Sequence, residues 1–171
     1  DKLERGSLNY ITNEIVKNSA AEVKSGRVVR MALAWNTTSA VDNPNPALHY
    51  MVEMGDIEAP EPTCNKDFIG VNFHGKAVSH FDAFTHIAYK DQLYGGKISS
   101  KVVHTTGSEW GTVDKLGAIV TRGVLLDAAR LKGLDWIEPG TAVMAQDILD
   151  AEVKFGFKIS QGDAVLLRSG H

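Results

Sequence analysis

The sequence predicts an α/β fold, formed by residues 1–171 as a single domain. Segments with helical spacing of apolar residues alternate with short apolar, β-branched runs that are typical of buried strands. Of the 171 residues, 43% are hydrophobic and 23% are charged, as in an ordinary folded protein. No Gly/Ser-rich linker, repeat or low-complexity tract divides the sequence, so one domain accounts for its length.

The N-terminal region predicts a helix over residues 13–25. Thr12 has the character of an N-cap, Glu14 lies in the first turn, and apolar residues recur at helical spacing until Gly26. The next run, VVRMALAW at 28–35, is short, apolar and β-branched at its start, which favours a buried strand.

Residues 36–65 predict a long irregular segment. Four of the 5 prolines fall there, and DNPNP at 42–46 is typical of consecutive turns. Long ordered loops in compact domains are more often functional than decorative, so we expect this segment to contribute to function.

The second half of the chain predicts four further elements. YGGK at 94–97 indicates a turn, and AIVTRGVLLD at 118–127 indicates one or two buried strands. Apolar residues at helical spacing predict a helix over 145–155 that ends at Gly156. GDAVLLR at 162–168 predicts a last strand, entered through a turn.

Charge and composition exclude several classes of partner. The net charge of -3 and a pI near 6.1 leave no basic surplus to neutralise phosphates, so we expect no nucleic acid partner. No apolar run approaches the ~18 residues that span a bilayer, so we expect no membrane partner. The single cysteine, Cys64, favours a reducing compartment, and we therefore expect a cytoplasmic location.

The stretch NFHGKAVSHFDAFTHI at 72–87 holds three of the chain's 6 histidines and an aspartate. His80 and Asp82 are two residues apart, so in an extended chain both project from one face. His74 and His86 lie six residues before and after His80; His86 shares that side in a continued strand, or folds back over it if the chain turns after Ala83. Imidazoles and a carboxylate suit Zn²⁺, Mn²⁺ or Fe²⁺ and can leave positions open for water and substrate, which favours a catalytic metal site.

Three functions are compatible with this cluster. The H-x-D pattern with a distal histidine also occurs in non-haem iron oxygenases, which need a far-downstream histidine followed by an arginine. His171 ends the chain without such an arginine, and His104 is only 22 residues beyond Asp82. A non-catalytic metal- or ligand-binding site is the second interpretation, and hydrolysis by activated water is the third.

The segment HGKAVSHFDAFTHIAYKDQLYGG at 74–96 resembles the signature of the cyclase family of metal-dependent amidohydrolases, which includes kynurenine formamidase and isatin hydrolase. The family pattern is H-x-G-T-H-x-D-x-P-x-H, and His80, Asp82 and His86 match it with the right spacing. Four more stretches resemble the longer-chain branch of the family: GSLNYIT at 6–12, DNPNPALHYM at 42–51, TRGVLLDAARLKGLDW at 121–136 and GDAVLLRSG at 162–170. The resemblance covers nearly the whole chain.

The sequence departs from the family pattern at several positions. Lys76 stands where the family has its first histidine, and His74 lies two residues earlier. Lys76 would repel a neighbouring metal ion unless it points outward. It would then either meet charge on the substrate or lie on the surface, and we expect the surface position. Ser79 replaces threonine but keeps the hydroxyl, and Phe84 stands where proline is common.

The resemblance implies a swivelling β/β/α cyclase-like fold, a mixed sheet with flanking helices, and assembly as a homo-oligomer. It implies hydrolysis of a small amide, formamide or cyclic imide C–N bond by metal-activated water. Zn²⁺ or Mn²⁺ would be held by His80 and Asp82, with His74 as a third candidate ligand. His86 would serve as general base and acid.

A small-molecule substrate is the expected partner, and Trp35, His49 and Tyr50 are candidates for its wall. A place in the core is the alternative for Trp35 and Tyr50. Family members extend well past the stretch that matches GDAVLLRSG, so we expect this chain to hold only the N-terminal and central part of the fold. The site would then be incomplete, with weak metal binding and feeble hydrolysis by these residues alone, and an apolar edge at 165–167 would be exposed and would drive association. The alternatives are that a partner or a second copy supplies the missing ligands, or that the protein is a non-catalytic binder.

Overall fold

The computed structural model describes residues 2–55, 60–75 and 77–170 of the chain. Two compact units are present: a larger unit from Asp1–Arg27 with Ala83–His171, and a smaller unit from Val28–Asp82. The described residues form helices and three two-stranded sheets, two antiparallel and one parallel. This combination confirms the predicted α/β class, with parallel and antiparallel pairing distributed over small sheets.

The N-terminal part of the larger unit is helical. It comprises α1 (Lys2–Arg5), the 3-10 helix η1 (Gly6–Tyr10) and α2 (Asn13–Ala20). Thr12 caps α2 as predicted, because its side chain accepts a hydrogen bond from the Ile15 amide at 3.3 Å. The predicted end of this helix is wrong: α2 stops at Ala20, since Val23 is 72% exposed and gives a further turn nothing to pack against.

The middle of the larger unit consists of short elements. They are η2 (Tyr94–Gly96), α3 (Ser99–Val102), the antiparallel pair β3 (Val103–His104) and β4 (Gly107–Ser108), and η3 (Val113–Lys115). The predicted turn at 94–97 is confirmed, since Gly95 and Gly96 both have φ of 74°, a conformation that favours glycine. Asp91 anchors α3 by accepting hydrogen bonds from the Ser100 amide and hydroxyl.

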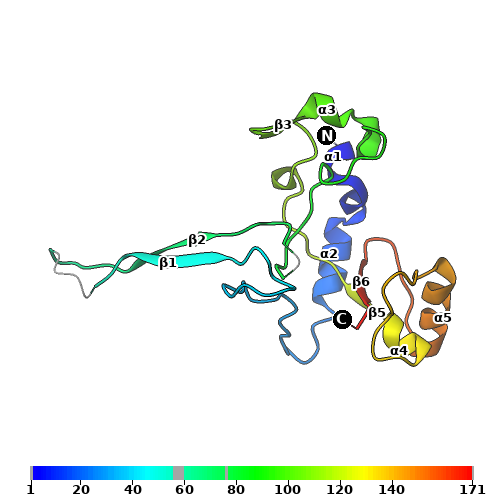
Figure 1. Cartoon of the computed structure of the whole chain (residues 1–171). Coiled ribbons are helices and arrows are strands. Elements are labelled where there is room, and N and C mark those ends of the chain that lie inside the picture. Colours follow the sequence, from blue (N-terminus) through cyan, green and yellow to red (C-terminus); the bar gives the residue numbers. More distant parts are fainter. Residues whose placement is uncertain (1, 56–59, 76, 171) are drawn as a thin grey trace. The chain divides into compact units, whose positions relative to one another are not determined.

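The C-terminal part of the larger unit is a parallel strand pair with two helices between the strands in sequence. The strands are β5 (Gly123–Asp127) and β6 (Ala164–Arg168), and the helices are α4 (Ala128–Lys132) and α5 (Ala145–Phe155). Figure 1 shows α4 and α5 beside the strand pair, and this part of the unit holds several of its buried side chains. These are Val124, Leu126, Ala128, Ala129, Ile137 and Ala151.

The predictions for this region are confirmed with one refinement. The helix α5 has the predicted bounds, and Gly156 closes it with a φ of 71°. Asp147 strengthens its start by accepting a hydrogen bond from the Met144 amide at 2.7 Å. The segment 118–127 contains one strand, β5, and its first residues lie outside it.

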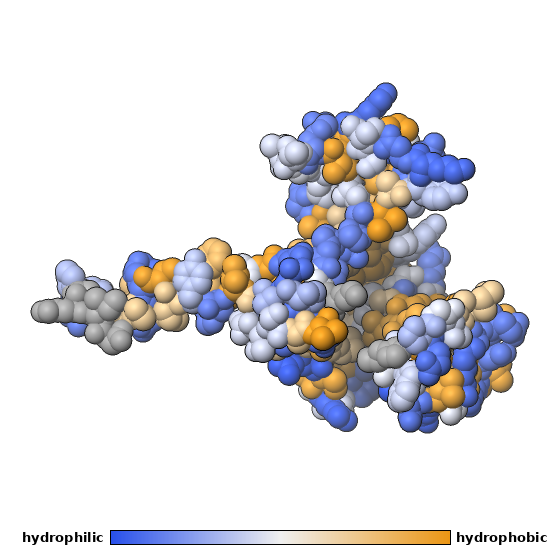
Figure 2. Space-filling model, in the orientation of Figure 1, coloured by the Kyte–Doolittle hydropathy of each residue, from blue (hydrophilic) through white to orange (hydrophobic). Residues whose placement is uncertain are grey.

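The smaller unit contains one antiparallel hairpin, β1 (Leu48–Glu53) with β2 (Lys66–Gly70). The prediction of an irregular segment over 36–65 is therefore wrong for β1. Its residues pair with β2, and the Tyr50 ring stacks on Phe68 with 5.0 Å between centroids. Figure 2 shows apolar side chains along this hairpin, and the exposed ones are Leu48, Tyr50, Met51, Val52, Phe68 and Ile69.

The strand predicted at 28–35 is absent from the structure. Its large apolar side chains are all exposed: Val28, Val29, Met31, Leu33 and Trp35. A strand is stabilised by a neighbouring strand, but the Leu33 amide donates to the Ser79 hydroxyl at 2.7 Å instead of to a strand carbonyl. The apolar composition of 28–35 is typical of a buried strand, but among the described residues no strand pairs with this segment.

None of the helices in the described part of the chain has the length and apolar character needed to cross a bilayer.

Candidate metal centre

A tight turn positions the first part of the histidine stretch. The Gly75 amide donates to the Asn72 carbonyl at 2.9 Å, and the Val78 amide donates to the Gly75 carbonyl at 3.3 Å. A Cβ at Gly75 would lie 3.0 Å from the Asn72 oxygen, so the turn favours glycine. Val78 is only 6% exposed and anchors the segment. The chain therefore turns at residues 72–75, ahead of the His80 and Asp82 pair.

The turn brings together His74, His80 and Asp82. One donor atom from each lies within 4.8 Å of the other two, the one such group of three found in the described residues. The His74 Nδ1 is 2.9 Å from Asp82 Oδ1, and the His80 Nε2 is 3.4 Å from the same oxygen. The two imidazole rings meet edge to face at 5.3 Å between centroids. These are the three metal-ligand candidates of the sequence analysis.

The hydrogen bond of His80 tests whether a cation fits here. The His80 Nδ1 is 2.7 Å from the Val78 carbonyl, and since a carbonyl only accepts, Nδ1 carries the hydrogen. In the neutral ring Nε2 then has a lone pair, and it faces another acceptor, the Asp82 oxygen. Two facing acceptors repel unless a proton or a cation lies between them, so this donor set fits a metal ion. Donation by the second ring nitrogen to a backbone carbonyl is also typical of metal-ligating histidines.

Phe73 supports both imidazoles and was missed by the sequence reasoning. Its ring is 5.4 Å from the His74 ring, edge to face, and 5.5 Å from the His80 ring. An aromatic residue directly before the first histidine was the available signal. The cluster itself is open to solvent, because the His74 and Asp82 side chains are 45% and 48% exposed and that of His80 is 22% exposed.

A pocket of about 200 Å³ borders His74 within the same unit. Its other lining residues are Asn43, Pro44, Asn45, Asn72 and Gly75. We call this cavity the asparagine pocket. The sequence predicted turns for DNPNP but gave no sign that this segment lies against the histidine stretch, because that contact depends on tertiary structure.

The three predicted substrate-wall residues lie outside both features in the described chain. Trp35 is 47% exposed. His49 lies on β1, and its Nε2 is 2.9 Å from Asp67. Tyr50 is stacked on Phe68, as described above. None of the three belongs to the metal-ligand group or to the lining of the asparagine pocket, and their substrate role stays a prediction.

The remaining candidates of the histidine stretch stay predictions as well. His86 belongs to the larger unit, where its amide donates to the Ala83 carbonyl at 3.0 Å, so the chain does turn after Ala83. Its role as general base is a prediction from the sequence. The expected surface position of Lys76 falls outside the described residues.

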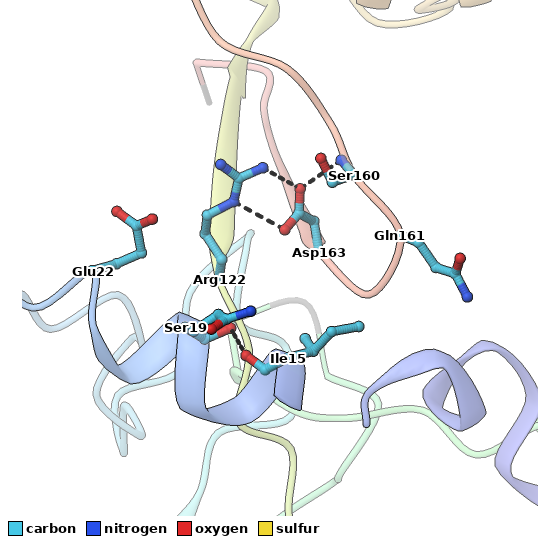
Figure 3. A pocket seen from close by; sticks show the side chains of 8 residues that line it. Ile15, Ser19, Glu22, Arg122, Ser160, Gln161 and Asp163 are labelled. Carbon is cyan, nitrogen blue, oxygen red and sulfur yellow. Dashed lines mark hydrogen bonds and ion pairs between the residues drawn. The ribbon is translucent and has the colours of Figure 1, made fainter. Parts of the chain in front are cut away.

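A second pocket, of about 240 Å³, lies in the larger unit (Figure 3). It is lined by Ile15, Asn18, Ser19, Glu22, Arg122, Ser160, Gln161 and Asp163. The Arg122 guanidinium binds both carboxylate oxygens of Asp163, at 3.0 and 2.5 Å. This pairing lowers the pKa of Asp163, and a further bond from Arg122 to the Lys158 carbonyl fixes the loop that leads into β6. The pairing of Arg122 with Asp163 at this pocket therefore serves the fold.

Comparisons with known proteins identify a family and a similar solved structure. No curated protein matches the chain. Residues 34–171 match the family model described as "Putative cyclase". A solved structure described as the crystal structure of a novel cyclase is 25% identical, with a TM-score of 0.85. That similarity covers 98% of this chain and 59% of the other, so the chain spans a little over half of the relative's length. The chain belongs to the cyclase family.

Proposed function

We propose that this protein is a metal-dependent hydrolase that cleaves the C–N bond of a small amide, formamide or cyclic imide. The observation that carries the proposal is the group of two imidazoles and one carboxylate in a member of the cyclase family. The resemblance of residues 74–96 to kynurenine formamidase and isatin hydrolase supports the choice of C–N bonds. The substrate is a small molecule.

His80 and Asp82 would hold the metal ion, with His74 as a third ligand. Two nitrogen donors and a carboxylate oxygen suit Zn²⁺ and Mn²⁺. When bound, the ion supplies polarisation of the substrate carbonyl and acidification of a water molecule. Three protein ligands are the usual number at a catalytic zinc, and they leave room for water and substrate.

The chain's own residues prepare this chemistry in two ways. The Val78 carbonyl holds His80 in the tautomer that presents Nε2 to the cluster. The turn at Gly75 returns His74 to within 2.9 Å of Asp82, so the donors are assembled by the fold before any ion arrives. Preassembly reduces the entropy lost on binding.

His86 is proposed as the group that moves the proton. It would accept a proton from the attacking water as the new C–O bond forms, and return it to the nitrogen as the C–N bond breaks. Imidazole suits this role because it gains and loses protons near neutral pH. The support for His86 is its spacing from Asp82 in the sequence.

We also propose that the protein assembles as a homo-oligomer and acts in the cytoplasm. Exposed apolar side chains on the strands support association, among them Leu125, Val165 and Leu167. Exposure of Val165 and Leu167 agrees with the apolar edge expected at 165–167.

A combined screen tests the proposed activity. Metal content is measured by mass spectrometry on the same sample that is assayed with N-formyl-arylamines, isatin-like imides and related small amides. We expect bound Zn²⁺ or Mn²⁺ and hydrolysis that a chelator abolishes and added metal restores. Turnover that requires oxygen and a 2-oxo acid would favour the iron oxygenase, and metal without turnover would favour a binding protein.

A further inference from the structure

We infer that the asparagine pocket is the subsite that receives an uncharged, planar amide or imide group of the ligand, with Asn45 and Asn72 as its specificity-determining residues. The inference rests on the proposed function, because it assigns the ligand that lies beside the metal centre. Ligand pockets commonly enclose about 300–1,000 Å³. At about 200 Å³ this cavity suits one group of a ligand rather than a whole large molecule.

The position of the pocket links it to the metal-ligand candidates. His74 lines the pocket and also lies 2.9 Å from Asp82. Asn72 and Gly75 line it from the turn that returns His74 to the cluster, since the Gly75 amide bonds the Asn72 carbonyl. A group held in the pocket therefore lies next to a metal-ligand candidate.

The opposite wall is held in place by Asn43. This residue is only 4% exposed, and its side-chain nitrogen donates to the carbonyls of Asn36 at 3.1 Å and Thr38 at 2.9 Å. Its backbone is paired in both directions with Ala40. A buried side chain with these bonds fixes the course of the DNPNP segment and presents Pro44 and Asn45 to the cavity. Asn43 is thus a positioning residue for the pocket wall.

The chemistry of the lining selects the type of ligand. Apart from His74, the described lining residues are uncharged: Asn43, Pro44, Asn45, Asn72 and Gly75. The side-chain amides of Asn45 and Asn72 each carry two donor hydrogens and an acceptor oxygen, which complements the donor and acceptor edge of an amide or imide. The Pro44 ring is an apolar surface suited to a flat group. Among the described lining residues of the metal-free pocket, an entering carboxylate would meet no fixed positive charge, so its loss of hydration would be costly.

The test uses formanilide as an uncharged probe and 4-formamidobenzoate as its anionic counterpart. Ligand-observed NMR on metal-free protein measures binding without turnover. We expect formanilide to bind at least tenfold more tightly than 4-formamidobenzoate. Asn72→Leu and Asn45→Leu should each weaken formanilide at least tenfold, whereas Asn18→Leu, which removes an exposed amide from α2, should leave binding unchanged.

A second substitution at position 72 is the control for misfolding. Asn72→Asp keeps the size of the side chain and replaces the amide donors by acceptors, so it should weaken formanilide while circular dichroism stays native. Unchanged formanilide binding in Asn72→Leu and Asn45→Leu, or tighter binding of the anion, would overturn the inference.

Metal titration separates this inference from the proposed function. Asn72→Leu and Asn45→Leu should bind Zn²⁺ like the wild type. If neither the wild type nor the variants bind metal but formanilide binding still depends on Asn45 and Asn72, the subsite stands and the hydrolase proposal fails. If metal binding and hydrolysis are intact and both leucine variants retain the wild-type KM and formanilide affinity, the subsite fails and the hydrolase proposal stands.

Discussion

His80 donates its Nδ1 hydrogen to the Val78 carbonyl at 2.7 Å, and this bond determines which nitrogen of the ring reaches Asp82. The Nε2 atom is then 3.4 Å from the Asp82 carboxylate. Because Val78 is buried, the carbonyl is held by the packing of its own side chain. The metal proposal depends on this tautomer, since a hydrogen on Nε2 would present a donor in place of a lone pair.

Replacement of His80 by alanine should weaken metal binding more than loss of a supporting group does. Loss of a group that merely orients a ligand typically costs 10- to 100-fold in affinity, so His80→Ala should cost at least about 100-fold. Calorimetric titration with Zn²⁺ measures the change. His104→Ala is the matched control, because His104 also lies near a carboxylate, that of Glu109 at 3.5 Å. Equal losses in both variants would remove His80 from the site.

The role of His86 predicts a different outcome from the ligand variants. His86→Ala should keep the bound metal and lose roughly 10²- to 10⁴-fold in hydrolysis rate, the usual contribution of a general base. Metal content and kcat on one preparation give the answer. An unchanged rate would exclude His86 from the mechanism, and loss of metal would make it a ligand instead.

Two neighbouring leucines of β5 in the larger unit allow a matched test of how burial contributes to stability. Leu126 is 2% exposed, whereas its neighbour Leu125 is 54% exposed. Leu126→Ala should lower the free energy of unfolding by about 2–5 kcal/mol, because the cavity left behind adds to the lost burial. Leu125→Ala should cost much less. Urea unfolding followed by circular dichroism compares the two variants. Similar losses of unfolding free energy would contradict the burial of Leu126 in β5.

The pairing of Asp163 with Arg122 predicts a loss of stability in acid. Hydrogen bonds from Arg122 lower the pKa of Asp163, so the folded chain binds a proton at this carboxylate less readily than the unfolded chain does. The stabilisation is complete above the unfolded pKa of about 3.9 and is lost as the pH falls through the lower folded value. Asp163→Asn should therefore lower Tm at pH 7, and its difference from the wild type should shrink below about pH 4.

Tm measured from pH 7 to pH 2 tests this dependence. Asp150→Asn, an exposed position on α5, is the control. A difference between wild type and Asp163→Asn that stays constant over the whole range would show that ionisation of Asp163 contributes nothing.

Local signals predicted the C-terminal elements well. Helical spacing and a terminal glycine are read within a few residues, and α5 has the predicted bounds with Gly156 as its cap. The strand β6 lies inside the predicted run for the same reason. The N-cap at Thr12 was also predicted, but the end of α2 was not, because it depends on whether Val23 has a packing partner.

Long-range pairing explains what the sequence could not predict. The run at 28–35 has the composition of a strand but lacks a paired neighbour in the described chain. The strand β1 was not predicted because prolines flank it in the sequence, and it is formed by its pairing with β2. Spacing in the sequence indicated that His80 and Asp82 lie together. The turn that brings His74 to them, and the pocket wall that Asn43 holds in place, depend on tertiary contacts that the sequence alone does not show.

Zinc titration of the wild type and Asp82→Ala is the most direct test of the metal centre. Asp82 is the residue that both histidines approach, so its loss should abolish stoichiometric binding and hydrolysis together. Glu109→Ala, which removes the carboxylate near His104 in the larger unit, should change neither. We predict stoichiometric Zn²⁺ or Mn²⁺ binding by the wild type and by Glu109→Ala, and none by Asp82→Ala. Stoichiometric binding that survives in Asp82→Ala would contradict the proposed site.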